Sequence, residues 1–277
     1  MATRPLAYPG SSRWILAELV LRQGSLAFYG VGMLTLSIVA VLLQGVDPRV
    51  LESGVNVWVK PAKFFSSVGI FALTAAWFFG YVRPERRNSP MMRRTVAVLI
   101  ISGTLELLWI SWQGANGLES HFNNDTVFYS VMYSLMGLFA VLLVGSTLPL
   151  AWEIARRPAL HLQKDFVAAV VTGLLLTFLL GGILGGYMSS QAGHSVGAEG
   201  GRTFLIGWNR SGGDLRVAHF LGIHAEQAIP ILAALAAGAG LGQRARWALL
   251  VAGAGAYVAL TLAIFAQAVA GRPLLPI

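Results

Sequence analysis

Ionisable side chains lie within long apolar segments of this sequence. Glu106 lies in one segment, and His219, His224 and Glu226 lie in another. Charged groups are costly in apolar surroundings, so they usually face the interior of a helix bundle and mark a functional site. Carboxyl groups and imidazoles exchange protons, and both bind metal ions. We therefore predict that Glu106 and Glu226 are catalytic or proton-relay residues.

Four of the five histidines fall toward the same ends of these segments: His121, His194, His219 and His224. Imidazole binds haem iron as an axial ligand, and it also binds zinc or iron ions. We predict His121 and His219 as the axial pair of a haem b, with His224 or His194 as substitutes. The chain has no cysteine, which excludes disulfides, thiolate metal sites and covalently attached c-type haem.

Basic side chains accompany these histidines. Lys60 and Lys63 flank Pro61 near the start of one apolar segment, and Arg216 lies three residues before His219. In a haem protein, these cations would bind the haem propionates. In a protein without haem, the two lysines would anchor their helix by extending toward the membrane surface.

Helical periodicity places Glu106 on a polar stripe. The stripe runs through Ser102, Glu106, Trp109, Gln113 and Asn116, at successive steps of four, three, four and three residues. At 1.5 Å per residue, Glu106 lies ~10 Å below one end of its segment, and His224 and Glu226 lie at a similar depth in theirs. The three residues therefore form a candidate zinc or iron site in one layer.

The segment that contains His219 also contains a helix breaker. His224 is rotated by ~140° from His219 on a regular helix, so the two cannot bind one ion unless a π-bulge near Gly222 realigns them. Pro230 lies four residues after Glu226, and the proline ring clashes with the carbonyl of that residue. We therefore predict a kink beside this acid.

Composition indicates which elements must position these residues. Of the 277 residues, 56% are hydrophobic and only 12% are charged, against ~25% in a soluble domain. Seven apolar segments are each close to the ~20 residues of a membrane-spanning helix, and they cover 25–45, 64–82, 95–113, 127–151, 166–188, 218–240 and 247–269. We predict an all-α fold, a single polytopic membrane domain (1–277) with a bundle of seven helices over 25–269. In the fifth segment, Gly182 and Gly186 predict a close helix contact.

Basic residues in the short connections predict the orientation in the membrane. Thirteen of the 20 Lys and Arg fall on the inner side if the N-terminus is cytoplasmic, so the positive-inside rule favours N-in and C-out. The connection from Arg83 to Arg94 alone contains five arginines. Residues 1–24 then form a cytoplasmic or interfacial lead-in, in which Glu18 and Arg22 pair one helical turn apart. The expected location is the bacterial inner membrane.

One connection is much longer than the others. Residues 189–217 form a loop of about 29 residues, whereas loops beyond ~15 residues are uncommon and usually functional or disordered. Its apolar residues Phe204, Leu205, Ile206 and Trp208 favour a loop that folds back as a cap on the outer face.

Three segments, LESHFN, GGDLRVAHF and WVKPAKF, resemble those of a widespread group of bacterial polytopic membrane proteins. The likeness runs over most of the chain and implies the same multi-span fold, but the group has no known activity and lends no site assignment.

Two other families of multi-span membrane proteins differ from this chain at their diagnostic positions. The chain lacks the HxxxH pair of the alkaline ceramidase and progestin-receptor superfamily, since His219 and His224 are five residues apart. The seventh segment contains no lysine for a retinal Schiff base.

Four functions remain open at this point. The first is a haem b or other redox protein that handles a lipophilic reductant such as quinol, with Glu106 and Glu226 relaying protons. The second is a metal-dependent enzyme that modifies a lipid, with zinc or iron as its cofactor. Proton- or ion-coupled transport and a non-catalytic subunit of a membrane complex are the others. The expected partners are the lipid bilayer, a quinone or lipid substrate, and further copies or subunits, with no nucleic acid.

Overall fold

The computed structural model describes residues 12–51, 54–191, 193–203 and 207–276. Residues 204–206, whose apolar side chains favour a folded cap, lie outside the described part, as do residues 1–11 of the lead-in. The described chain consists of helices and one two-stranded antiparallel sheet. The predicted all-α fold is confirmed.

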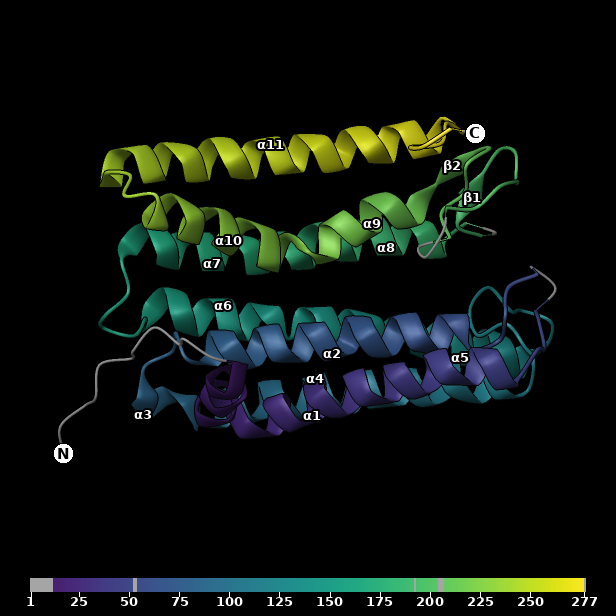
Figure 1. Cartoon of the computed structure of the whole chain (residues 1–277), viewed down its shortest axis with the longest axis horizontal. Helices are drawn as coiled ribbons and strands as arrows, with labels where there is room; N and C mark the ends of the chain where they lie inside the picture. Colours follow the sequence, from purple (N-terminus) through teal and green to yellow (C-terminus); the bar gives the residue numbers. More distant parts are fainter. Residues whose placement is uncertain (1–11, 52–53, 192, 204–206, 277) are drawn as a thin grey trace.

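Long helices make up the bundle (Figure 1). The first three spans are α1 (Ser12–Val46), α2 (Val59–Phe79) and α4 (Pro90–Ala115), and the short α3 (Pro84–Arg87) precedes α4. The next two spans consist of α5 (Val127–Gly145) with α6 (Thr147–Arg156), and of α7 (Lys164–Leu176), the π-helical turn η1 (Thr177–Gly181) and α8 (Gly182–Ser189). The last are α9 (Leu215–Ile223) with α10 (Ala225–Gly238), and α11 (Gln243–Val269). Strands β1 (Ser195–Val196) and β2 (Gly213–Asp214) lie between α8 and α9.

Six of these helical stretches are long and apolar enough to cross a membrane, and α9 with α10 makes a seventh when the bent pair is taken as one span. The chain is therefore that of a multi-pass membrane protein, as its hydropathy predicts. The two strands and the C-terminus lie at one end of the bundle, which we name the cap end (Figure 1). The opposite end carries α3 within the arginine-rich connection from Arg83 to Arg94, and we name it the arginine end.

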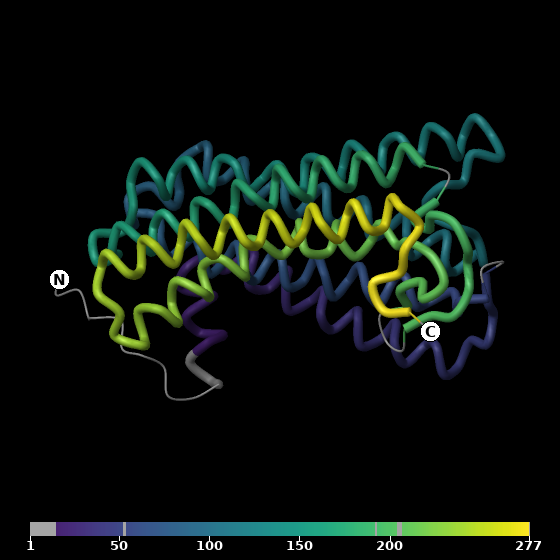
Figure 2. Tube along the Cα trace, turned by 90° about the horizontal axis from the view of Figure 1, so that it is seen from above, coloured from purple at the N-terminus to yellow at the C-terminus, as the bar shows by residue number. Residues whose placement is uncertain are grey.

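The helices pack in two groups that follow the chain order. In the first group, α1 packs along α2, and α2 also contacts α4 and α6. In the second group, α10 packs against α7, and α11 lies on the outside of α9 and α10 (Figure 2). The contact between α6 and α7 joins the groups.

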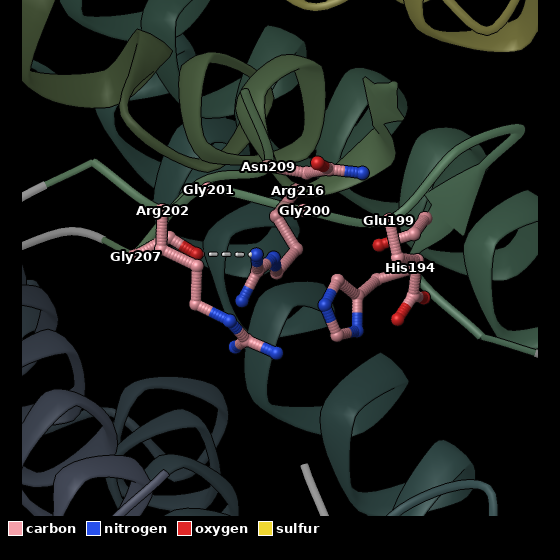
Figure 3. Close-up of a pocket in the computed structure, with 9 residues that line it drawn as sticks. His194, Glu199, Gly200, Gly201, Arg202, Gly207, Asn209 and Arg216 are labelled. Carbon is pink, nitrogen blue, oxygen red and sulfur yellow. Dashed lines mark hydrogen bonds between the residues drawn. The ribbon is translucent and has the colours of Figure 1, made fainter. Parts of the chain in front are cut away.

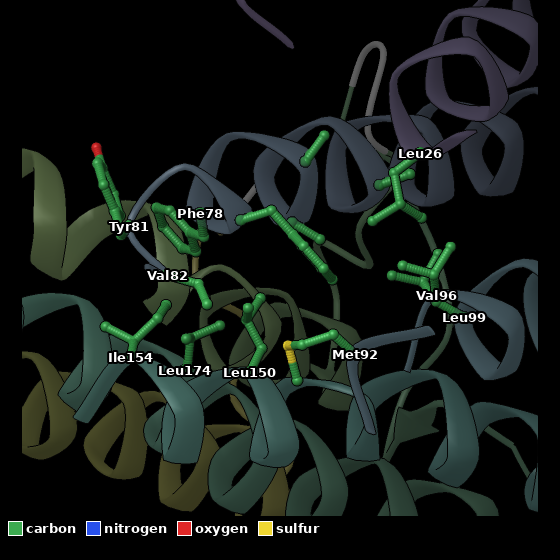
Figure 4. Packing of buried hydrophobic residues seen from close by; sticks show 14 of the residues in the cluster. Leu26, Phe78, Tyr81, Val82, Met92, Val96, Leu99, Leu150, Ile154 and Leu174 are labelled. Carbon is green, nitrogen blue, oxygen red and sulfur yellow. The ribbon is translucent and has the colours of Figure 1, made fainter. Parts of the chain in front are cut away.

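A buried apolar cluster connects the two groups (Figure 4). Leu26 of α1, Phe79 of α2 and Met92 of α4 are at most 1% exposed, and Leu150 of α6 and Leu174 of α7 belong to the same cluster. In lipid, where the hydrophobic effect does not drive helices together, close packing of this kind supplies much of the attraction between them. The cluster therefore holds α2 in a fixed position relative to four other helices.

The sixth span is broken at His224, six residues before Pro230. His224 has φ −98° and ψ 8°, and α9 and α10 meet there with a bend of 54°. Helix α10 continues through Pro230. The predicted kink is thus present in this span. It lies at His224, directly before α10, and Glu226 lies in the first turn of α10.

Neighbouring helices satisfy the backbone groups that this break releases. Thr177 Oγ1 of η1 accepts a hydrogen bond from Glu226 N at 2.9 Å and donates one to Ile223 O at 3.4 Å. Tyr257 Oη of α11 donates to Leu221 O at 2.5 Å. A break inside a membrane is tolerated when such groups find partners within the protein.

The π turn lies in the fifth span rather than in the sixth. A π turn adds one residue to the helical repeat and rotates the faces of the helix that follows. A Cβ placed on Gly182 or Gly186 would meet nothing within 4 Å, so the contact predicted for this pair is wrong. Gly185 makes a close contact instead, because its Cβ would lie 2.8 Å from His219 Cε1.

Candidate functional site

The loop between α4 and α5 carries His121, and the polar stripe of α4 holds this loop in place. Trp109 Nε1 donates a hydrogen bond to Ser120 O at 3.1 Å, and Gln113 Nε2 donates to Glu119 O at 3.3 Å. Gln113 is only 2% exposed, so its amide needs a partner inside the protein. The stripe predicted from periodicity therefore positions an imidazole.

His121 and Glu106 lie beside each other at the cap end. The distance from His121 Nε2 to Glu106 Oε1 is 3.9 Å, too long for a direct hydrogen bond. The Glu106 side chain is 5% exposed, and its Oε2 has no hydrogen-bond partner in the described part of the chain. Aromatic rings adjoin the imidazole, with centroid distances of 5.6 Å to Phe64 and 6.1 Å to Tyr133. The pair therefore forms a polar site with an aromatic wall.

Lys60 of α2 completes this site. Its ammonium interacts electrostatically with both Glu106 and Glu119. Burial, and then the positive charge of Lys60, lower the pKa of His121 from its usual 6.5 to about 3, against a smaller opposite effect from the backbone of Ser120. His121 is therefore neutral at physiological pH, and one of its ring nitrogens can accept a hydrogen bond. We name Lys60, Glu106 and His121 the cap-end triad.

Asp214 and Arg216 organise the connection between α8 and α9, in which we name residues 193–203 and 207–214 the cap. Asp214 Oδ1 accepts hydrogen bonds from Arg216 N at 3.0 Å and Nε at 2.9 Å, and Oδ2 accepts from Arg216 Nη2 at 2.6 Å and Asn209 N at 2.8 Å. Burial acts to raise the pKa of Asp214, but the hydrogen bonds and charge of Arg216 lower it below its usual 3.8. Arg216 Nη2 also donates to Gly207 O. These hydrogen bonds fix the Arg216 side chain in place and connect Gly207 with Asp214.

A small cavity lies under the cap (Figure 3). Its lining includes His194, Arg202, Asn209 and Arg216, and its volume is about 20 Å³, which is room for about one water molecule. Burial, and then the charge of Arg216, lower the pKa of His194 from 6.5 to about 4, with Asp214 opposing the shift. His194 is thus a second neutral imidazole in a basic surrounding.

Lys63 connects α2 with this cap. A Cβ on Gly207 would lie 3.5 Å from Lys63 Nζ. The charge of Lys63 is therefore close to the backbone that Arg216 also contacts. Lys60 and Lys63, three residues apart on one helix, face two neighbouring polar regions at the cap end.

A separate polar network surrounds the break at His224. Gln227 Nε2 donates to Glu226 Oε1 at 2.9 Å and to Thr74 Oγ1 of α2 at 3.1 Å. The other end of the same amide, Gln227 Oε1, lies 3.2 Å from His224 Nδ1. Gln227 thus joins the histidine and the acid to α2. Gln227 was not among the predicted site residues, although an amide next to an acid in an apolar segment is a signal that the sequence contains.

His219 lies apart from the cap-end triad, against Gly185 of α8, and its Nδ1 is buried without a hydrogen-bond partner in the described residues. The structure therefore brings Lys60, Glu106 and His121 together, and it links His224 with Glu226 through Gln227. Among the described residues, no three His, Asp or Glu side chains are placed to hold one metal ion. Comparisons with protein-family models, curated proteins and solved structures find no match for this chain.

Proposed function

We propose that this membrane protein binds the head group of a lipophilic quinol at the cap-end triad and accepts protons from it. The observation that carries this proposal is the buried Oε2 of Glu106, which has no hydrogen-bond partner in the described chain. A buried carboxylate oxygen in this state is costly, so a ligand that donates a hydrogen bond to it would bind favourably.

The chemistry of a quinol matches the groups around this oxygen. Its aromatic ring would stack with Phe64 and Tyr133, which adjoin His121. Its hydroxyl group donates to Glu106 or to His121 Nε2. When His121 Nδ1 carries the proton and donates to Ser120 Oγ, at 3.1 Å, Nε2 is left as a hydrogen-bond acceptor, and Glu106 is the group that would take the proton.

Haem b would be the electron acceptor in this proposal. The histidine that would hold it is His219, which is packed against Gly185 and has a buried Nδ1 without a hydrogen-bond partner in the described residues. A bound haem would take electrons one at a time. The residues of this chain would bind the quinol, exclude water and accept its protons.

Quinol binding is tested with the purified protein in mild detergent. Quinones quench tryptophan fluorescence, and Trp109 lies next to the loop that carries His121. We expect saturable quenching by a short-chain benzoquinone, with the affinity reduced about tenfold in Glu106→Gln or His121→Gln, since each loses one hydrogen bond to a charged or buried group. Asp125→Asn, an exposed change in the same loop, is the matched control. Equal quenching in all four proteins would contradict the proposal.

Haem is tested separately by the visible absorption spectrum of the oxidised and dithionite-reduced protein. We expect a Soret band and an α band that sharpens on reduction after expression with sufficient haem. A folded protein with a featureless spectrum would remove haem b from the proposal and leave quinol binding to be judged by the quenching experiment.

A further inference from the structure

A second cavity lies at the arginine end, far along α2 from the cap-end triad. Its volume is about 320 Å³, and it lies between the bend of α1, the end of α2 and the short α3. The lining includes Leu21, Arg22, Gln23, Phe79, Arg87 and Asn88. None of these residues takes part in the proposed quinol site.

A break in α1 forms one wall of this cavity. Gln23 has φ −158° and ψ 93°, which interrupts the helix, and the first turns of α1 point away from the remainder (Figure 2). The Gln23 side chain compensates for the break, because its Oε1 accepts hydrogen bonds from Ser25 N at 2.8 Å and Leu26 N at 3.4 Å. This is the N-capping of a new helix, so the bend is built into the sequence.

Two arginines are fixed at the edge of the cavity. The guanidinium of Arg22 lies 4.0 Å from the ring centroid of Trp77, and its Nη1 donates to Trp77 O at 2.8 Å. Arg87 Nη2 donates to Gly80 O at 2.9 Å, and its Nε donates to Val82 O at 3.1 Å. The carbonyls at the C-terminal end of a helix carry partial negative charge, which favours cations at this position.

Arg22 packs closely against the residue that follows α2. A Cβ at Gly80 would overlap the Arg22 side chain, so a larger residue there would shift the guanidinium. Glu18, one helical turn before Arg22, accepts a hydrogen bond from its Nε at 2.7 Å, as the sequence predicts. These contacts use two of the five guanidinium donors of Arg22, and two of the five of Arg87, so both retain hydrogen-bonding capacity.

The two guanidinium groups are close enough to repel each other. Burial, and then the charge of Arg22, lower the pKa of Arg87, while Glu18 and Glu85 oppose this effect. Both acids thus offset part of the positive charge. An anion in the cavity would relieve the remaining repulsion, and guanidinium groups bind phosphate oxygens with good geometry.

We propose that this cavity binds the phosphate head group of an anionic phospholipid. A lipid is favoured over a soluble phosphate because Leu21, which is 78% exposed, offers an apolar surface next to the basic groups. Trp77 and Tyr81 lie beside Arg22, and such residues mark the level of the lipid head groups. Basic pockets between membrane helices are known binding sites for anionic head groups.

The test is the thermal unfolding of the purified protein in mild detergent with added phosphatidylglycerol. We expect the midpoint temperature to rise, with little change on addition of phosphatidylcholine or inorganic phosphate. Equal stabilisation by phosphatidylcholine would overturn the proposal, as would full reproduction of the effect by inorganic phosphate.

Two variants and a control locate the binding site. Arg87→Gln should abolish the response, but it also removes two hydrogen bonds to the end of α2. Asn88→Asp adds a negative charge at the exposed rim and should weaken phosphatidylglycerol binding about fivefold without removing those bonds. Arg94→Gln removes an exposed arginine at the same end and should leave binding unchanged. If Asn88→Asp and Arg94→Gln both bind as the parent does, the proposal is wrong.

Discussion

Three of the buried carboxylates differ in how many hydrogen bonds they accept. Asp214 accepts four hydrogen bonds, from Arg216 and from the backbone of Asn209. Glu226 accepts one from Gln227. Glu106 has a fully buried oxygen with no hydrogen-bond partner in the described chain, at a site where a neutral imidazole lies 3.9 Å from its other oxygen. This contrast separates a cap-forming acid from one that is suited to receive a ligand.

The lowered pKa values of His121 and His194 predict a loss of stability in acid. Their pKa values are about 3 and about 4 in the folded protein, against a usual value of 6.5. Between the folded pKa values and 6.5, the unfolded chain therefore binds more protons than the folded chain. The contribution of the two neutral histidines to stability is fully present above about pH 6.5, and it is lost as the pH falls toward their folded pKa values.

The measurement is thermal unfolding in detergent at pH 7 and at pH 4.5. We expect His121→Asn and His194→Asn each to reduce the difference between the two midpoints. His161→Asn is the control, because His161 is exposed at the arginine end. The assignment fails if the double variant His121→Asn with His194→Asn keeps the full pH dependence of the parent.

Gly185 provides a test of packing at a single position. A methyl group there would lie 2.8 Å from His219 Cε1, so Gly185→Ala must displace the imidazole or the helix. We expect a loss of about 1–3 kcal/mol in the free energy of unfolding, the usual cost of overpacking. Gly186→Ala is the matched control, because its methyl group would meet nothing within 4 Å. Equal stability of the two variants would contradict the position of His219.

At the scale of the element, the broken sixth span depends on groups that its neighbours supply. Thr177→Val removes the hydroxyl that binds Glu226 N and Ile223 O. A buried N–H left without a partner costs about 1–3 kcal/mol, so we expect a destabilisation of this size in the unfolding of the purified protein. Thr177→Ser keeps the hydroxyl and should restore most of the stability. A Val variant as stable as the Ser variant would show that this bond does not support the break.

The helices could be predicted from the sequence, but the irregularities within them could not. Long apolar runs have few alternatives in a membrane, so the spans follow directly from hydropathy. The position of the bend at His224 depends on Thr177 and Tyr257, which are remote in sequence. Likewise, the spacing of Gly182 and Gly186 does not reveal which face of α8 meets a neighbour, and Gly185, not this pair, makes the close contact.

The candidate site was also predictable only in part. The polar stripe that contains Glu106 follows from a regular helix, and its members Trp109 and Gln113 do hold the loop with His121. The proximity of Lys60 depends on how α2 packs against α4, which local pattern does not specify. The hydrogen bond from Gln227 to Thr74 depends on how α2 lies beside the sixth span, which the local sequence pattern does not specify.

At the scale of the whole molecule, the C-terminal residues fasten the cap. Arg210 donates hydrogen bonds to Leu275 O at 3.4 Å and to Pro276 O at 2.9 Å, and Gly213 lies directly against Ala268 of α11. We expect Arg210→Gln to increase amide hydrogen exchange of residues 207–214 several-fold, because local opening then breaks fewer bonds. Arg272→Gln, an exposed change nearby, is the control. Unchanged exchange in Arg210→Gln would show that the tail does not restrain the cap.

Helix α2 takes part in three polar regions of the described structure. Lys60 belongs to the cap-end triad, Thr74 binds Gln227 beside the broken span, and the carbonyls at its far end bind Arg22 and Arg87. Between these regions, α2 packs into the apolar cluster that it shares with four other helices. A substitution that displaced α2 would therefore change all three sets of polar contacts together, although the regions lie at different depths of the bundle.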